Sequence, residues 1–100
     1  MIDFDEVEIT DNKTSSRFEM KVDGNISYIE YMLAGNKIIL THTEVPVQLE
    51  GKGVASAMIK KVLMHVEGTD RKLVPLCPFV AAYIKRHPEW EKIVDESSLI

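Results

Sequence analysis

The N-terminal half of the chain alternates between apolar and polar residues with a period of two, which is typical of half-buried β-strands. The clearest run is 17–22, where Phe18, Met20 and Val22 share one face. Three further runs rich in apolar or β-branched residues lie around Val7 and Ile9, at 26–33 and at 37–44. Polar or glycine-containing turns separate these runs at 11–16, 23–25 and 34–36. This half therefore predicts an antiparallel meander of three or four strands.

The period becomes helical after Pro46. Apolar residues recur at spacings of three and four from Ala55 to Val66, which predicts an amphipathic helix that stops at Gly68. A short apolar strand follows at 72–76, and a second helix is predicted from Pro78 to the residue before His87-Pro88. Strands followed by helix, strand and helix predict an α+β fold with a mixed sheet.

Composition and charge narrow the class of protein. A chain of 100 residues that is 45% apolar and 28% charged predicts a single globular domain over 1–100, with a polar tail at 91–100 that frays. The net charge of −4 argues against nucleic acid as a partner. The longest uncharged, mostly apolar stretch, 73–84, is shorter than the ~20 residues of a membrane span. We therefore expect no membrane partner, and a monomer or weak dimer.

Cysteine usage points to the compartment. The single cysteine, Cys77, excludes an internal disulfide, which suits a reducing, cytoplasmic location. The three histidines and this cysteine show no metal-ligand spacing, so no metal site is predicted.

The segment with the most chemical information is Gln48-Leu49-Glu50-Gly51-Lys52-Gly53-Val54-Ala55-Ser56, which joins a predicted strand to the first predicted helix. Two glycines two residues apart let the backbone approach a ligand closely, and a helix N-terminus adds free N–H donors. Lys52 adds a cation at the edge. The segment predicts a phosphate or pyrophosphate site, or alternatively a tight turn with no ligand. Neither a P-loop nor a dinucleotide fingerprint fits, because Gly53 and Ser56 stand where those motifs need other residues.

Gln48, Gly51 and Gly53 resemble the signature of the GNAT superfamily of acyl-CoA N-acyltransferases: Gln or Arg, two residues, Gly, one residue, then Gly or Ala. The order of predicted elements is similar to that family from about Val7 to Trp90. His42-Thr43 and Leu76-Cys77-Pro78-Phe79 resemble a small single-domain GNAT-like subgroup with a Cys after the fifth strand. The resemblance implies a GNAT-like, mostly antiparallel mixed sheet. It also implies an acetyl-CoA-dependent N-acetyltransferase acting on an unidentified amine acceptor, for which a protein is the candidate.

The resemblance also implies which residues hold acetyl-CoA. Backbone N–H groups from Gln48 through Ala55 would bind the pyrophosphate, and Thr43 to Val45 would pair with the pantetheine arm between two splayed strands. The implied cofactor-binding set is Thr43, Glu44, Val45, Gln48, Leu49, Glu50, Gly51, Lys52, Gly53, Val54, Ala55 and Ser56.

Two residues are candidates for the chemistry. The resemblance places Cys77 where the thioester would arrive, at a strand end before a helix. Helix N-terminal donors would there stabilise a thiolate nucleophile, but a small buried hydrophobe is an equal reading. His42 is a general base if it faces the cleft, although strand alternation equally allows it to face away. Tyr83 is expected in the core. The alternative function is a non-catalytic module that binds coenzyme A, or a partner protein, in the same groove.

Overall fold

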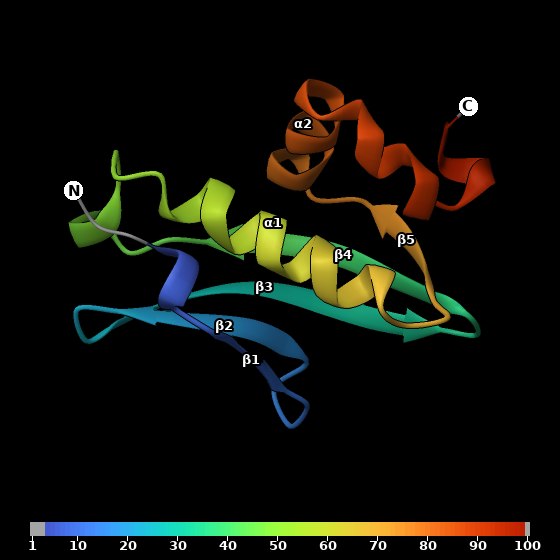
Figure 1. Ribbon diagram of the computed structural model, residues 1–100. Coiled ribbons are helices and arrows are strands. Elements are labelled where there is room, and N and C mark those ends of the chain that lie inside the picture. Colours follow the sequence, from blue (N-terminus) through green and yellow to red (C-terminus); the bar gives the residue numbers. More distant parts are fainter. Residues whose placement is uncertain (1–3, 100) are drawn as a thin grey trace.

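A computed structural model describes residues 4–99; residues 1–3 and 100 of the predicted domain lie outside that range. Five strands form one sheet in the order β1-β2-β3-β4-β5 (Figure 1). The strands are β1 (Ile9–Asn12), β2 (Arg17–Val22), β3 (Asn25–Ala34), β4 (Lys37–Glu44) and β5 (Lys72–Pro75). The helices are α1 (Val54–Glu67) and α2 (Pro78–Arg86), with 3₁₀ turns at Phe4–Glu6, Val47–Leu49, Pro88–Ile93 and Glu96–Leu99.

The sheet is mixed. Strands β1 to β4 pair antiparallel through short turns, whereas β5 pairs parallel to β4 after the α1 crossover. The predicted α+β class and mostly antiparallel mixed sheet are therefore confirmed.

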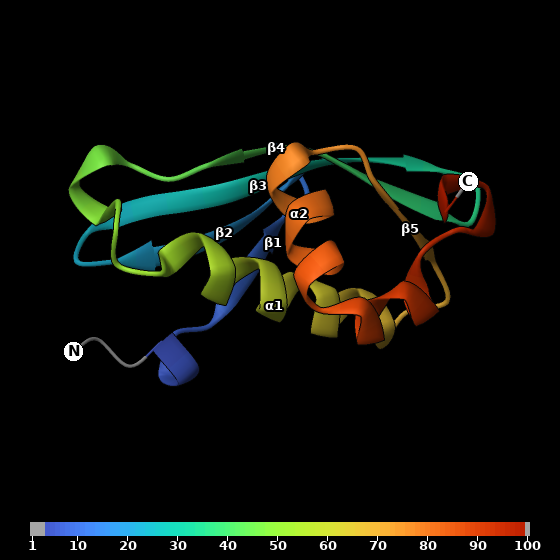
Figure 2. The same cartoon turned by 90° about the horizontal axis from the view of Figure 1, so that it is seen from above.

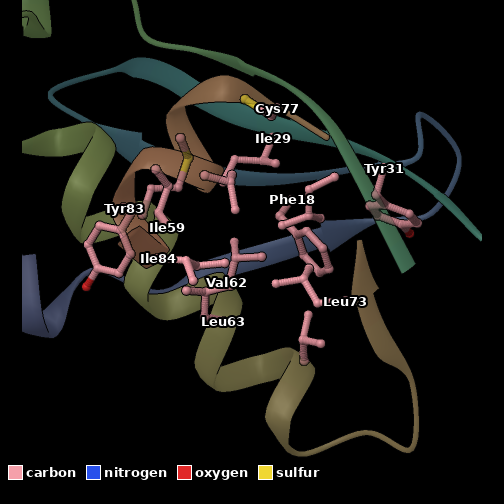
Figure 3. Packing of buried hydrophobic residues seen from close by; sticks show 14 of the residues in the cluster. Phe18, Ile29, Tyr31, Ile59, Val62, Leu63, Leu73, Cys77, Tyr83 and Ile84 are labelled. Atoms are coloured by element: carbon pink, nitrogen blue, oxygen red, sulfur yellow. The ribbon is translucent and has the colours of Figure 1, made fainter. Parts of the chain in front are cut away.

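Both helices pack on the same face of the sheet, as the view from above shows (Figure 2). The sheet contributes Phe18, Met20 and Leu40 to the core, each at most 1% exposed, and α1 contributes Val62 and Leu63 at 0%. Figure 3 shows these α1 side chains pointing toward Phe18. Burial of this alternating face against a helical stripe is the main source of stability in so small a domain.

The opposite face of the sheet carries polar side chains. Arg17 and Glu19 form an ion pair there at 2.6 Å, and the Arg17 guanidinium lies 4.3 Å from the centre of the Tyr28 ring. Among the described residues no helix packs on this side.

A one-residue bulge in β4 changes which side chains face the helices. Tyr31 pairs with Leu40 and Glu30 pairs with His42, so Thr41 has no partner of its own on β3. Leu40 and Thr43 consequently both point toward the helices, at 0% and 6% exposure. Regular alternation would instead have put Leu40 and His42 on one face.

Two local predictions were wrong. The predicted turn at 11–16 begins later, because Asp11 and Asn12 belong to β1. Side-chain hydrogen bonds hold both polar residues in the strand: the Tyr31 hydroxyl donates to Asp11 at 2.7 Å, and the Asn12 amide donates to Glu19 at 3.1 Å.

The frayed tail was the second. Ile93 and Val94 are buried, at 7% and 4% exposure, and the Asp95 N–H donates to the Leu73 carbonyl at 2.8 Å. The two apolar side chains, which the polar composition of the segment conceals, anchor it beside β5. Within residues 4–99, no helix combines the length and apolarity needed to cross a bilayer.

Candidate functional site

A cavity of about 390 Å³ opens where β4 ends and α1 begins. Its volume lies in the usual range of ~300–1,000 Å³ for small-molecule sites. We call it the loop cavity. It is lined by Thr43, Glu44, Val45, Leu49, Glu50, Gly51, Gly53, Val54, Ala55, Ser56 and Phe79. The connection between β4 and α1 that forms its wall extends beyond the sheet at the left of Figure 1.

The loop cavity gathers most of the residues that the sequence singled out. Every lining residue except Phe79 belongs to the expected cofactor-binding set, whereas Gln48 and Lys52 of that set do not line the cavity. Phe79 was not predicted as a site residue. It is 61% exposed on the first turn of α2, and its place two residues after Cys77 was the signal available in the sequence.

Both glycines of the signature adopt a left-handed backbone. Gly51 has φ of 77° and Gly53 has φ of 80°, a region that side chains with a Cβ rarely occupy. A Cβ at either position would meet nothing within 4 Å. The glycines are therefore required by backbone conformation, and the space in front of them is open.

Free backbone donors converge on the same region. The Ala57 N–H makes the first bond of α1, to the Gly53 carbonyl at 3.1 Å, so the N–H groups of Val54, Ala55 and Ser56 lie before the hydrogen-bonded ladder. No side chain caps this helix end, and its first turn carries no acidic residue. An anion placed here would gain N–H donors and the positive end of the helix dipole.

The 3₁₀ turn narrows the set of available donors. The Leu49 and Glu50 amides already donate to the carbonyls of Pro46 and Val47, at 2.9 and 3.2 Å. Within residues 4–99 the amides of Gly51 and Gly53 have no such backbone partner. Leu49, at 1% exposure, anchors the turn in the core and so fixes the loop against α1.

Side-chain charge in the loop cavity is negative. Glu44 and Glu50 line it, and no lining residue is basic. Backbone amides and the α1 terminus must therefore supply the attraction for any phosphate that binds there.

Strands β4 and β5 part at the inner end of the loop cavity. Their pairing runs from Lys37–Lys72 to Leu40–Pro75, and the Cys77 N–H then donates to the Leu40 carbonyl at 2.8 Å. No residue of β5 pairs with the rest of β4, from Thr41 to Glu44. Within the segment expected to accept a pantetheine arm, Thr43 and Glu44 thus lie on an edge of β4 that β5 leaves unpaired, and Val45 follows the strand.

Cys77 lies behind Thr43. Its Sγ is 3.1 Å from the Thr43 Oγ1, and the side chain is 1% exposed. It occupies the N-cap position of α2 but makes no side-chain capping bond, so the expected contact with helix donors is replaced by the threonine hydroxyl. Thr43 lines the loop cavity and Cys77 does not, so the sulfur is not exposed to the cavity in this conformation.

His42 faces the other side of β4. Its Nε2 is 3.0 Å from Glu44 Oε2, both side chains are 54% exposed, and the ring does not line the loop cavity. The bulge at Thr41 accounts for this direction. Through Glu44, which does line the cavity, the pair connects the uncovered face of the sheet to the cavity rim.

Tyr83, the other side chain considered for the chemistry, belongs to the core. Tyr83 is buried in the core as expected, and that burial raises its pKa. Its ring packs 4.3 Å from His87. Among residues 4–99 no three His, Cys, Asp or Glu side chains gather in a way that would hold a metal ion.

Known proteins with similar sequences indicate the family. The family model for GCN5-related N-acetyl-transferases matches residues 17–93. Protein NATD1 from Gallus gallus, Mus musculus and Homo sapiens is 27% identical over 85 residues, covering 82% of this chain and 77%, 77% and 75% of the three relatives. The chain belongs to the GCN5-related N-acetyl-transferase family, which confirms the resemblance seen in the sequence.

Proposed function

We propose that this chain binds acetyl-CoA in the loop cavity and transfers the acetyl group to an amine. Family membership supports an acetyltransferase, and one structural observation carries the assignment of the site. The signature glycines, the free N-terminal amides of α1 and the unpaired edge of β4 all border one cavity. Each offers what a different part of acetyl-CoA requires.

The pyrophosphate fits the donors at the outer end. The amides of Gly51, Gly53 and the first turn of α1 have no backbone acceptor among residues 4–99, and Gly51, Gly53 and Val54 to Ser56 line the cavity. The pantetheine arm contains peptide-like amides, and the edge of β4 at Thr43 and Glu44, which β5 leaves unpaired, matches them. The thioester then reaches Thr43, beside the Cys77 sulfur.

Two routes of transfer follow from this placement. In the direct route the neutral amine attacks the thioester carbonyl carbon, the C–S bond breaks, and the amine proton passes to the departing thiolate. In the two-step route the Cys77 Sγ makes that attack and gives its proton to the thiolate; an amine then takes the acetyl group and returns a proton to Sγ. A backbone N–H near Val45 would stabilise the oxyanion in either route.

One observation favours a second candidate function, coenzyme A binding without transfer. Cys77 is 1% exposed and lies off the cavity wall, and His42 points away from it. A module that only holds coenzyme A, or a partner protein in the same groove, would need neither residue.

Isothermal titration with acetyl-CoA tests binding. Saturable binding by the wild type, lost in Gly53→Glu, is expected because the carboxylate would enter the space in front of the amides. Gly24→Glu is the matched control: Gly24 has φ of 78°, meets equally open space and lies in the β2–β3 turn. No binding to the wild type at millimolar acetyl-CoA, or equal binding by both variants, would refute the site.

Turnover separates the two candidate functions and the two routes. Release of free thiol in the presence of an amine panel is expected for a transferase, whereas binding without release would identify a coenzyme A-binding module. Intact mass spectrometry then reports whether Cys77 gains an acetyl group. Activity that survives in Cys77→Ser, with no acetylated wild-type protein, would leave direct transfer as the route.

A further inference from the structure

A second cavity, of about 450 Å³, lies at the other end of α1 and shares no lining residue with the first. It opens between the last turn of α1, the β1–β2 turn, the β3–β4 hairpin and the segment before β5. We call it the aromatic cavity. Nothing in the acetyltransfer chemistry uses it.

The floor of the aromatic cavity is apolar and is built from rings that are tilted relative to one another. Phe18 packs against Tyr31 with ring centres 4.9 Å apart, and the His65 ring meets Phe18 edge-on at 5.3 Å. Figure 3 shows Phe18 and Tyr31 side by side. Leu33, 53% exposed, extends the apolar surface to the rim. Aromatic walls of this kind favour a planar apolar ligand.

The rim carries an excess of positive charge although the whole chain has a net charge of −4. Lys13 and Arg71 line the cavity with a single carboxylate, Asp11, which already accepts the Tyr31 hydroxyl at 2.7 Å. Within residues 4–99 neither cation forms an ion pair with a carboxylate. The Arg71 Nη1 donates to the Gly35 carbonyl at 2.9 Å, which holds the guanidinium at the rim and leaves its other N–H groups for a ligand.

We propose that the aromatic cavity binds a small planar carboxylate, with its ring against the apolar lining that Leu33 extends and its carboxylate between Arg71 and Lys13. Cation-lined apolar cavities recognise ligands in this way, because the apolar floor supplies affinity and the few polar groups fix orientation. The proposal is independent of acetyl-CoA binding, since the two cavities share no residue.

Indole-3-acetate is a suitable probe, followed by amide chemical shifts of the ¹⁵N-labelled chain. We expect saturable shifts at Ser16, Leu33 and Thr69, which line the cavity, and none at the signature loop. Arg71→Gln and Lys13→Gln should each weaken binding about tenfold or more. Lys21→Gln, an exposed charge of β2 outside the cavity, is the matched control and should bind as the wild type does. The uncharged indole-3-acetamide should bind more weakly than the acid.

Several results would overturn the proposal. They are the absence of saturable shifts at millimolar probe, equal affinity of the acid and the amide, or unchanged affinity in both charge variants. If Arg71→Gln fails to fold because the Gly35 contact is lost, Lys13→Gln decides, since within residues 4–99 the Lys13 side chain forms no hydrogen bond or ion pair. Shifts confined to the signature loop would likewise assign the probe to the other cavity and contradict the proposal.

Discussion

The two cavities at opposite ends of α1 offer an anion different kinds of donor. In the loop cavity the donors are main-chain amides and the helix terminus, while the lining side-chain charges, Glu44 and Glu50, are both negative. In the aromatic cavity the donors are the side chains of Lys13 and Arg71 over an aromatic floor. A main-chain site depends on backbone conformation, so the identity of its glycines matters most. A side-chain site depends on individual charges and tolerates changes of backbone elsewhere.

The largest expected loss of stability comes from a substitution in the core face of α1, the helix that joins the two cavities. Leu63 is fully buried on α1, and Leu63→Ala should lower the free energy of unfolding by about 2–5 kcal/mol. Both cavities should lose affinity together, because each uses one end of α1. Met64→Ala is the control, since Met64 is 56% exposed and its loss should change stability by less than about 0.5 kcal/mol. Chemical denaturation measures both variants, and similar stability losses would contradict the packing described.

Tyr31, which lines the aromatic cavity, should make the stability of the fold depend on pH in the alkaline range. Burial, and then the hydrogen bond to Asp11, raise the pKa of Tyr31 to about 12, while the nearby Arg71 opposes the shift. Because the folded pKa exceeds the unfolded value of about 10, the stabilisation is complete below pH 10 and is lost as the pH rises toward 12. It amounts to something on the order of 2 kcal/mol.

Other groups also titrate in alkali. The difference in free energy of unfolding between wild type and Tyr31→Phe therefore isolates the contribution of Tyr31. Unfolding measured from pH 9 to 12 should show a smaller loss of stability in the variant. Tyrosinate absorbance should keep its latest-titrating component, near pH 12, in the wild type and in Tyr83→Phe, and lose it in Tyr31→Phe. Equal alkaline losses in wild type and Tyr31→Phe would contradict the buried hydroxyl.

The left-handed backbone of the loop cavity predicts a smaller loss of stability than that of Leu63→Ala. Gly51→Ala places a Cβ at φ of 77°, which should cost about 1–2 kcal/mol of stability and weaken acetyl-CoA binding. Gly68→Ala is the matched control, because Gly68 has helical φ of −76° and its added Cβ makes only an ordinary 3.4 Å contact. Thermal unfolding compares the two. Indole-3-acetate binding should be unchanged in Gly51→Ala, and an equal loss at both cavities would show that the sites are not independent.

The smallest effect concerns charge in the loop cavity. Glu50 repels a pyrophosphate, so Glu50→Gln should tighten acetyl-CoA binding about two- to fivefold at low salt, with a smaller gain at high salt. Glu8→Gln, an exposed carboxylate outside the cavity, should change affinity less. Titration calorimetry at two ionic strengths measures the acetyl-CoA affinity of both variants. Weaker binding by Glu50→Gln would mean that this side chain helps to form the site.

Much of the fold follows from local pattern. The alternation at 17–22 predicts β2, and the spacing from Ala55 to Val66 predicts α1 with its stop at Gly68. The signature glycines fall in the loop cavity because a strand-to-helix turn at that point needs left-handed backbone. These features depend on neighbouring residues, so the sequence is sufficient to predict them.

The features that sequence missed depend on distant residues. Thr41 carries no sign of a bulge, yet the bulge decides that Thr43 faces the cavity and His42 does not. Asp11 is held in β1 by Tyr31, twenty residues away. The aromatic cavity has no local motif, because it joins residues from four strands, a helix end and two loops.

Amide shift mapping with acetyl-CoA tests the central claim most directly. The account predicts saturable shifts at Gly51, Gly53, Val54 to Ser56 and along Thr43 to Val45, with Ser16, Leu33 and Thr69 unchanged. Shifts at the aromatic cavity instead, or no shifts at the loop at millimolar acetyl-CoA, would contradict it.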